Sequence, residues 1–182
     1  MIFSHKSVEL EYYRREGISP VHQNISNLKK HFQIRASLYR LLGFVPSFFK
    51  GKDILEIGPG SGHNSIYIAS LLPKTYDLVE PNPTALKDIS KIFGNLSTKH
   101  TNPKIIPKCI EDLKRNKLYD ITISEGWLGG TDNYEKKIFA KISSFVKKGG
   151  VMIITFYSPI GGLATFLRRL LGYRLISHLK TM

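Results

Sequence analysis

Residues 54–64 place a strand, a glycine-rich turn and the start of a helix directly after one another. The apolar run contains one acid, Glu56, and glycines follow at alternate positions, Gly58, Gly60 and Gly62. Glycine tolerates positive φ and lets a ligand approach the backbone closely. A strand, a glycine turn and a helix build nucleotide sites in doubly wound α/β folds, so this stretch predicts such a site.

The spacing of the glycines excludes two common phosphate sites. A dinucleotide fingerprint that begins at Gly58 would need its third glycine at position 63, where the chain has His63. A P-loop would need Gly-Lys-Ser/Thr after the turn, and this chain lacks it.

A second acid, Glu80, follows the next expected strand. It lies 20 residues after Gly60 and is followed by Pro81-Asn82-Pro83. A carboxylate at a strand end at this distance suits an acceptor for ribose hydroxyl groups. The order of acid, glycine turn, helix and second acid therefore predicts a nucleoside ligand more firmly than the glycines alone.

The strand and helix signals alternate along the chain. This alternation predicts a doubly wound, mostly parallel α/β sheet of about five strands with right-handed crossovers. Strands are expected at 52–57, 75–80, 104–107, 118–124 and 151–157, and helices at 5–16, 24–42, 63–72, 83–94 and 132–148. The last of these helices is expected to end at Gly149-Gly150.

Length and cysteine content place limits on the class of protein. A chain of 182 residues is expected to form one structural domain: an N-terminal helical flank at 1–50, a core at 51–157 and a basic amphipathic helix at 158–182. The single cysteine, Cys109, excludes an internal disulfide and fits a reducing compartment. No secretory signal or membrane-spanning run is apparent, so we expect a cytoplasmic protein.

The net charge of +13 comes from the two flanks. Residues 1–50 have eight Lys or Arg against three acids, residues 51–135 have ten against eleven, and residues 136–182 have nine and no acid. A basic flank is expected to attract an anionic acceptor, an anionic membrane surface or nucleic acid, or only to keep the protein soluble.

The order Glu56-x-Gly58-x-Gly60-x-Gly62 resembles the first motif of class I S-adenosylmethionine (SAM)-dependent methyltransferases, which have a Rossmann-like fold. The resemblance covers residues 24–157. It implies SAM as the cofactor, with Glu56 near the methionine ammonium and Glu80 on the ribose. Since SAM carries no phosphate, the turn need only offer bare backbone.

The family's adenine motif follows the third expected strand, and this chain departs from it. Many relatives carry Gly-Asp-Ala-Glu-Asp-Leu, and Cys109 stands where the first Asp would bind the adenine amino group. The resemblance then leaves Glu111, Asp112 or the backbone of Ile110 and Glu111 to contact adenine. Cys109 is expected to be a packed small residue.

The fourth expected strand ends in Ser124-Glu125-Gly126-Trp127, at the edge where open α/β sheets bind ligands. Glu125 is a candidate general base, and Trp127 is expected on the acceptor side or in simple packing. His63 is a second catalytic candidate, expected to be neutral because a helix N-terminus disfavours the cation. No His, Cys, Asp and Glu cluster has metal-site spacing, so no metal is expected.

The sequences at 18–23, 31–44 and 55–64 are similar to those of bacterial methyltransferases associated with surface-polysaccharide biosynthesis. Family members have two further strands after the fifth, whereas residues 158–182 resemble a helix. We therefore expect the C-terminal β-hairpin to be missing and 151–157 to be an edge strand. Three explanations would account for an unpaired edge strand: the chain is truncated, an oligomer or partner covers the edge, or the final helix covers it. A peripheral position of that helix at the inner membrane face is a further expectation.

The resulting hypothesis is transfer of a methyl group from SAM to an oxygen or nitrogen nucleophile of a small molecule or glycan. Two alternatives stay open: a truncated or non-catalytic partner protein with the SAM fold, and an RNA methyltransferase. The absence of Asn/Asp-Pro-Pro-aromatic and Pro-Cys motifs after the fourth strand makes a nucleic-acid base the weaker acceptor.

Overall fold

The computed structural model describes residues 8–20, 22–126, 128 and 133–155. Within these residues, five parallel strands form a sheet in the order β3-β2-β1-β4-β5. The strands are β1 (Asp53–Ile57), β2 (Thr75–Val79), β3 (Lys104–Ile106), β4 (Tyr119–Ser124) and β5 (Val146–Ile154). This arrangement confirms the predicted doubly wound fold class.

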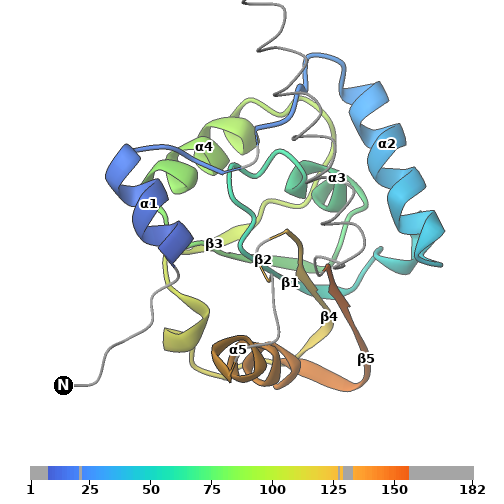
Figure 1. Cartoon of the computed structure of the whole chain (residues 1–182). Helices are drawn as coiled ribbons and strands as arrows, with labels where there is room; N and C mark the ends of the chain where they lie inside the picture. Colours follow the sequence, from blue (N-terminus) through green and yellow to red (C-terminus); the bar gives the residue numbers. More distant parts are fainter. Residues whose placement is uncertain (1–7, 21, 127, 129–132, 156–182) are drawn as a thin grey trace, which may run out of the picture.

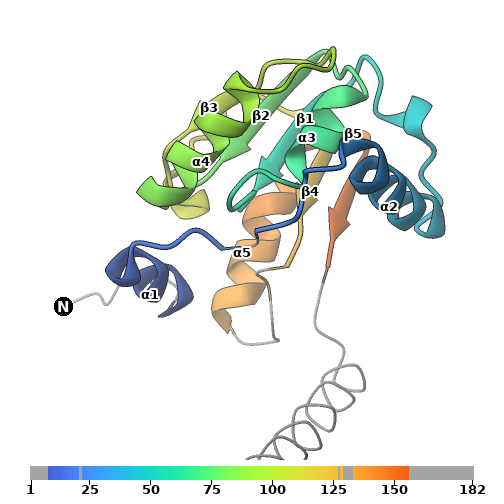
Figure 2. The same ribbon diagram turned by 90° about the horizontal axis from the view of Figure 1, so that it is seen from above.

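Helices cover both faces of the sheet (Figure 1). The helices are α1 (Val8–Glu16), α2 (Leu28–Leu41), α3 (Ser65–Ser70), α4 (Pro83–Gly94) and α5 (Asn133–Ser143), with short 3-10 helices η1 (Pro46–Phe48) and η2 (Ile110–Asp112). Helices α2, α3 and α4 pack on one face, and α5 and η2 on the other. Helices α1 and α2 lie at opposite ends of the molecule (Figure 2).

The apolar pattern of the strands explains the two-sided core. In β1, Ile54 faces the cluster formed with α2, α3 and α4, whereas Leu55 and Ile57 face the cluster formed with α5. Both faces of a parallel sheet are covered by its crossover helices, so its strands are apolar on both sides. Glu56 is the exception on the α2 face, because it is a buried acid in an otherwise apolar strand.

Two asparagines set helix starts. The Asn27 side chain accepts a hydrogen bond from the Lys30 backbone N–H, so α2 begins at Leu28, four residues later than predicted. The Asn82 side chain caps α4 by accepting from the Thr84 backbone N–H at 3.0 Å, with Pro83 in the first turn.

The predicted helix over 132–148 was wrong at its C-terminal end. Helix α5 ends at Ser143, and β5 begins at Val146, before the two glycines. The glycines form an irregularity inside the strand: Gly149 has a φ of 77°, and a Cβ on Gly150 would lie 2.8 Å from the Asp120 carbonyl oxygen. They allow close pairing with β4 and do not terminate the helix.

The amino ends of the strands form a compensated charge cluster. Lys147 Nζ donates to Asp53 at 2.9 Å and to Asp120 at 3.0 Å, and Asp120 also accepts from the Asp53 backbone N–H at 2.8 Å. The Lys147 hydrogen bond, more than any other effect, lowers the pKa of Asp53. The carboxylates at this edge of the sheet therefore have partners within the protein.

Several sequence expectations concern parts of the chain outside the described residues. These are the place of Trp127, the last residues of the predicted 151–157 strand, the expected absence of a C-terminal hairpin and the expected helix at 158–182. The domain boundaries stay predictions. Within the described ranges, no helix combines the length and apolarity that crossing a bilayer requires.

Ile121 of β4 provides a test of the core, since it is fully buried between β1 and β5. We expect Ile121→Ala to lower the free energy of unfolding by about 2–5 kcal/mol, because it leaves a cavity that the sheet cannot fill. Urea denaturation followed by circular dichroism measures this change. Leu118→Ala, at a half-exposed position just before the same strand, should cost less than about 1 kcal/mol. Equal losses would contradict the packing described here.

Candidate functional site

The candidate site lies at the carboxyl ends of β1, β2 and β4. The strand order reverses between β1 and β4, since β2 and β3 lie on one side of β1 and β4 and β5 on the other. Ligands of open α/β sheets bind at such a switch point. The turn after β1, Glu80 after β2 and Glu125 after β4 meet along this edge.

The turn after β1 is built on glycines that other residues could not replace. Gly58, Gly60 and Gly62 all have positive φ. A Cβ on Gly60 would lie 2.9 Å from the Pro20 carbonyl oxygen, and one on Gly62 would lie 3.0 Å from the Ile89 side chain. The turn is therefore held closely between the N-terminal segment and α4.

The carboxylate of Glu80 joins this turn to the end of β2. It accepts hydrogen bonds from the Gly60 backbone N–H at 3.0 Å and from the Asn82 backbone N–H at 2.9 Å. Burial raises the pKa of Glu80 to about 6, although both N–H groups favour the ionised form. Each carboxylate oxygen keeps a further lone pair for a ligand donor.

The N-terminal segment crosses the same edge. The Pro20 carbonyl accepts from the Ser61 backbone N–H at 3.1 Å, and Asn82 Nδ2 donates to the Ile18 carbonyl at 2.9 Å. Arg14 Nη2 donates to the Pro81 carbonyl at 2.9 Å. The residues that precede α2 therefore form part of the wall of the site.

Glu56 is buried on the α2 face of β1. The Tyr76 hydroxyl donates a hydrogen bond to its carboxylate. Burial is the main cause that raises the pKa of Glu56 to about 7, and the nearby charge of Glu125 raises it further, whereas Tyr76 and Arg35 oppose the rise. This carboxyl group is poised to change charge near neutral pH.

Glu125 lies in a buried network with two residues of α2. Arg35 Nη2 donates to Glu125 Oε2 at 2.6 Å, and the Tyr39 hydroxyl donates to Oε1 at 2.7 Å. Arg35 Nη2 also lies 3.2 Å from the Tyr39 hydroxyl. Burial lowers the pKa of Arg35, but Tyr39 and Glu125 outweigh this effect and raise it. The guanidinium is therefore a permanent cation in the site.

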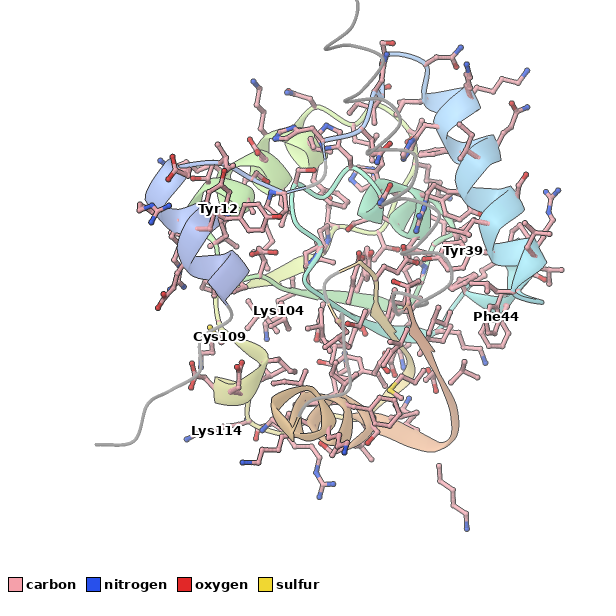
Figure 3. The ribbon with its side chains drawn as sticks, in the orientation of Figure 1. Tyr12, Tyr39, Phe44, Lys104, Cys109 and Lys114 are labelled. Atoms are coloured by element: carbon pink, nitrogen blue, oxygen red, sulfur yellow. The ribbon has the colours of Figure 1, made fainter. Side chains whose placement is uncertain are left out.

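The sequence pattern did not indicate that Arg35 and Tyr39 belong to the candidate site. Arg35 falls on the apolar face of the predicted helix, and an arginine there is rarely buried without a carboxylate partner. An arginine on an apolar helix face could have indicated that a carboxylate partner exists. It could not have identified Glu125, which lies 90 residues after Arg35 in the chain. Figure 3 marks Tyr39 between α2 and the body of the fold.

His63 has surroundings of its own. Its Nδ1 is hydrogen-bonded to the Ser61 hydroxyl, and its backbone carbonyl accepts from His31 Nε2 at 2.8 Å. Its ring meets that of His22 edge to face at 5.3 Å. Burial is the main cause that lowers the pKa of His63, and His22 lowers it further while Asp88 raises it.

His63 also lines a cavity of about 420 Å³ between α4 and the segment that leads into α2. The other lining residues are His22, Ile25, Leu28, Asp88, Lys91, Ile92, Asn95 and Leu96. Among the interactions described, none joins His63 to Glu125. The structure therefore assigns the two catalytic candidates to different surroundings.

The predicted adenine residues form η2, which follows β3. Ile110 is buried against the α5 side of the core, whereas Glu111 and Asp112 are exposed. Cys109 is half-buried at the start of η2, far across the molecule from Tyr39 (Figure 3).

The chemistry of this edge suits a ligand with several kinds of polar group. Three buried or half-buried carboxylates lie at this edge, those of Glu56, Glu80 and Glu125. Glu125 pairs with the Arg35 guanidinium, whose charge also acts on Glu56. The cation that acts on Glu80 is Arg14. Arg35 Nε is buried and lacks a hydrogen-bond partner. A ligand with hydroxyl or ammonium donors and a carboxylate would satisfy these groups. Within the described residues, no group of His, Cys, Asp and Glu could hold a metal ion.

Three comparisons place the chain among known proteins. The family model described as "Methyltransferase domain" matches residues 29–174. Ribosomal RNA small subunit methyltransferase G of Campylobacter jejuni subsp. doylei is 35% identical over 79 residues, which is 42% of each chain. The chain thus matches less than half of this curated relative.

Solved structures share the fold at low identity. A DhpI complex with S-adenosylhomocysteine (SAH) has a TM-score of 0.57 and 18% identity, over 82% of this chain and 67% of its own. The N-methyltransferase NodS of Bradyrhizobium japonicum, in complex with SAH, has a TM-score of 0.55 and 16% identity, over 80% and 70%.

The electrostatics of the site can be tested at Glu56, through the pH dependence of the free energy of unfolding. The pKa of Glu56 is about 7 in the folded protein against a usual 4.5, so the folded state holds the proton more tightly. Its stabilising contribution is complete below pH 4.5 and is lost as the pH rises through 7, by about 3 kcal/mol. Glu56→Gln should remove this dependence.

The measurement is urea denaturation of both proteins between pH 4.5 and pH 7.5, compared as the difference between the two curves. The variant should gain stability relative to the wild type as the pH rises. A difference that is constant over this range would show that Glu56 is ionised throughout.

Proposed function

The chain belongs to the methyltransferase domain family, and on that premise we propose that it transfers a methyl group from SAM to an oxygen or nitrogen nucleophile of a small-molecule or glycan acceptor. The contact between Glu80 and Gly60 carries this proposal, because it holds a buried carboxylate against a glycine turn at the switch point of the sheet. A carboxylate in this position suits ribose hydroxyl groups.

The residues present fit SAM. Glu80 would accept from the ribose hydroxyls, and the glycine turn at 58–62 would lie against the cofactor. Glu56 would face the ammonium group, and the unpaired Nε of buried Arg35 is the available donor for the carboxylate. Residues 110–112 are proposed for adenine, through the backbone of Ile110 and Glu111 or the side chains of Glu111 and Asp112. When bound, the cofactor supplies a methyl group activated by its sulfonium.

Glu125 is the better supported of the two candidate bases. It lies at the carboxyl end of β4, where Arg35 and Tyr39 fix the orientation of its carboxylate. A base held in one orientation can accept the proton of an acceptor hydroxyl without reorganisation. His63 is the second candidate and would act only on an acceptor that enters the cavity next to α4. Trp127 keeps its proposed place on the acceptor side.

The acceptor is proposed to be small or a glycan, in line with the resemblance to polysaccharide-associated enzymes. An N-methyltransferase among the structural neighbours is in keeping with a nitrogen acceptor. Two observations favour RNA as the second candidate: the ribosomal RNA methyltransferase that matches over 79 residues, and the net charge of +13. Cys109 stands where relatives carry the Asp that binds adenine. This difference motivates a third candidate function, that of a non-catalytic partner protein.

Glu80→Ala tests the cofactor assignment. We expect it to weaken SAM binding by about 10- to 100-fold, because it removes a charged acceptor for two ribose hydroxyls and loosens the Gly60 turn. Isothermal titration calorimetry measures the affinity, with Glu11→Ala, an exposed change in α1, as the matched control. Unchanged affinity in Glu80→Ala would rule out the ribose assignment.

Glu125→Gln tests the proposed role of Glu125 as the catalytic base. The assay follows transfer from methyl-labelled SAM to separate pools of sugar nucleotides, oligosaccharides and ribosomal RNA. Label should enter a small-molecule or glycan pool, and the variant should lose about 100-fold in turnover while SAM binding stays within about threefold. Because the change disturbs a buried ion pair, Glu125→Asp serves as the second variant and should restore part of the turnover. Label in the RNA pool would favour the second candidate. Binding of SAM with no transfer to any pool would favour the third.

A further inference from the structure

Helix α2 has two faces with different properties. Its inner face presents His31, Arg35 and Tyr39, all buried. Its outer face presents Ile34, Leu38 and Leu41, which are spaced as neighbours on one side of a helix.

Leu42 and Val45 extend the exposed apolar surface beyond the end of α2. The five side chains of this aliphatic stripe (Ile34, Leu38, Leu41, Leu42 and Val45) leave between 37% and 86% of their surface exposed. Single exposed aliphatic residues are common, but a continuous stripe of five indicates an interaction surface.

The charges around the stripe have one sign. Residues 17–52 contain no Asp or Glu. The exposed cations of this segment are Lys29, Lys30, Arg40, Lys50 and Lys52. The segment that carries the stripe therefore combines aliphatic side chains with cations and contributes no acid of its own.

We propose that the aliphatic stripe of α2 docks on the surface of an anionic lipid bilayer. Aliphatic side chains on one side of a helix enter the boundary between headgroups and acyl chains, while cations beside them attract anionic headgroups. The absence of acids on this segment fits such a surface, because the segment itself would bring no carboxylate to the headgroups. This inference stands apart from the proposed reaction and needs no cofactor.

The charges also argue against other occupants. A second copy of the chain, docked stripe to stripe, would bring together two segments whose own charges are all positive. Residues 156–182 carry four cations and no acid, so charge attraction would not hold that segment on the stripe either. Nucleic acid would match the charge, but single strands bind through aromatic stacking and this surface is aliphatic.

Docking through α2 would bring the bilayer close to the candidate site. The inner face of the same helix holds Arg35 and Tyr39 against Glu125, and a helix with its side chains is about 10 Å across. Figure 2 shows α2 at the periphery of the molecule, where a flat surface can approach it. An acceptor anchored in the membrane would then lie within reach of the site.

The experiment is co-sedimentation of the full chain with vesicles. One set contains phosphatidylcholine alone, and the other contains equal parts of phosphatidylcholine and phosphatidylglycerol. We expect binding to the second set only, weakened when salt is raised from about 0.1 M to about 0.5 M. Leu41→Glu should lower the partition by about 10-fold or more, since it replaces the most exposed side chain of the stripe with an acid.

Leu118→Glu is the matched control, because Leu118 is also a half-exposed leucine but belongs to the segment just before β4 and not to α2. It should leave the partition unchanged, and circular dichroism should show both variants folded. Absence of binding to the anionic vesicles would overturn the proposal, as would binding that Leu41→Glu does not weaken. A dimer detected by light scattering and dispersed by Leu41→Glu would assign the stripe to a second copy instead.

Discussion

The candidate site depends on one buried carboxylate, that of Glu80, which joins two backbone turns. Its oxygens accept from the N–H groups of Gly60 and Asn82, so the turn after β1 and the start of α4 have a fixed relative position. A buried carboxylate without such partners would be strongly destabilising, and two N–H donors offset that cost only in part. The part of the burial cost that these hydrogen bonds do not offset appears as the raised pKa of Glu80. A ligand that donates further hydrogen bonds to Glu80 would therefore bind to a group that is already positioned.

The two edges of the sheet differ in how their charges are compensated. At the amino ends of the strands, Lys147 bridges Asp53 and Asp120. At the carboxyl ends, Arg35 pairs with Glu125, while Glu56 and Glu80 have no cation in hydrogen-bond contact among the described residues. The paired charges at the amino ends stabilise the fold. The carboxylates of Glu56 and Glu80 at the carboxyl ends leave negative charge that a cationic ligand can neutralise, as expected of a functional edge.

Local sequence was sufficient to predict much of the fold and part of the site. The glycines at 58–62 and the 20-residue distance to Glu80 are set by the geometry of one strand–turn–helix–strand unit, and the structure brings Glu80 and Gly60 into contact. The end of α5 was predicted wrongly because Gly149-Gly150 usually ends a helix, whereas pairing with β4 starts the strand at Val146. The partnership of Arg35 and Tyr39 with Glu125 spans about 90 residues, so no local pattern could have shown it.

Amide hydrogen exchange with and without S-adenosylhomocysteine would locate the cofactor site, because it reports where a cofactor binds without requiring an acceptor. We predict slower exchange at residues 58–62 and 80–82, where the glycine turn meets Glu80, and unchanged exchange in α5. Protection elsewhere in the chain, with none at the turn, would contradict the assignment of this edge as the cofactor site.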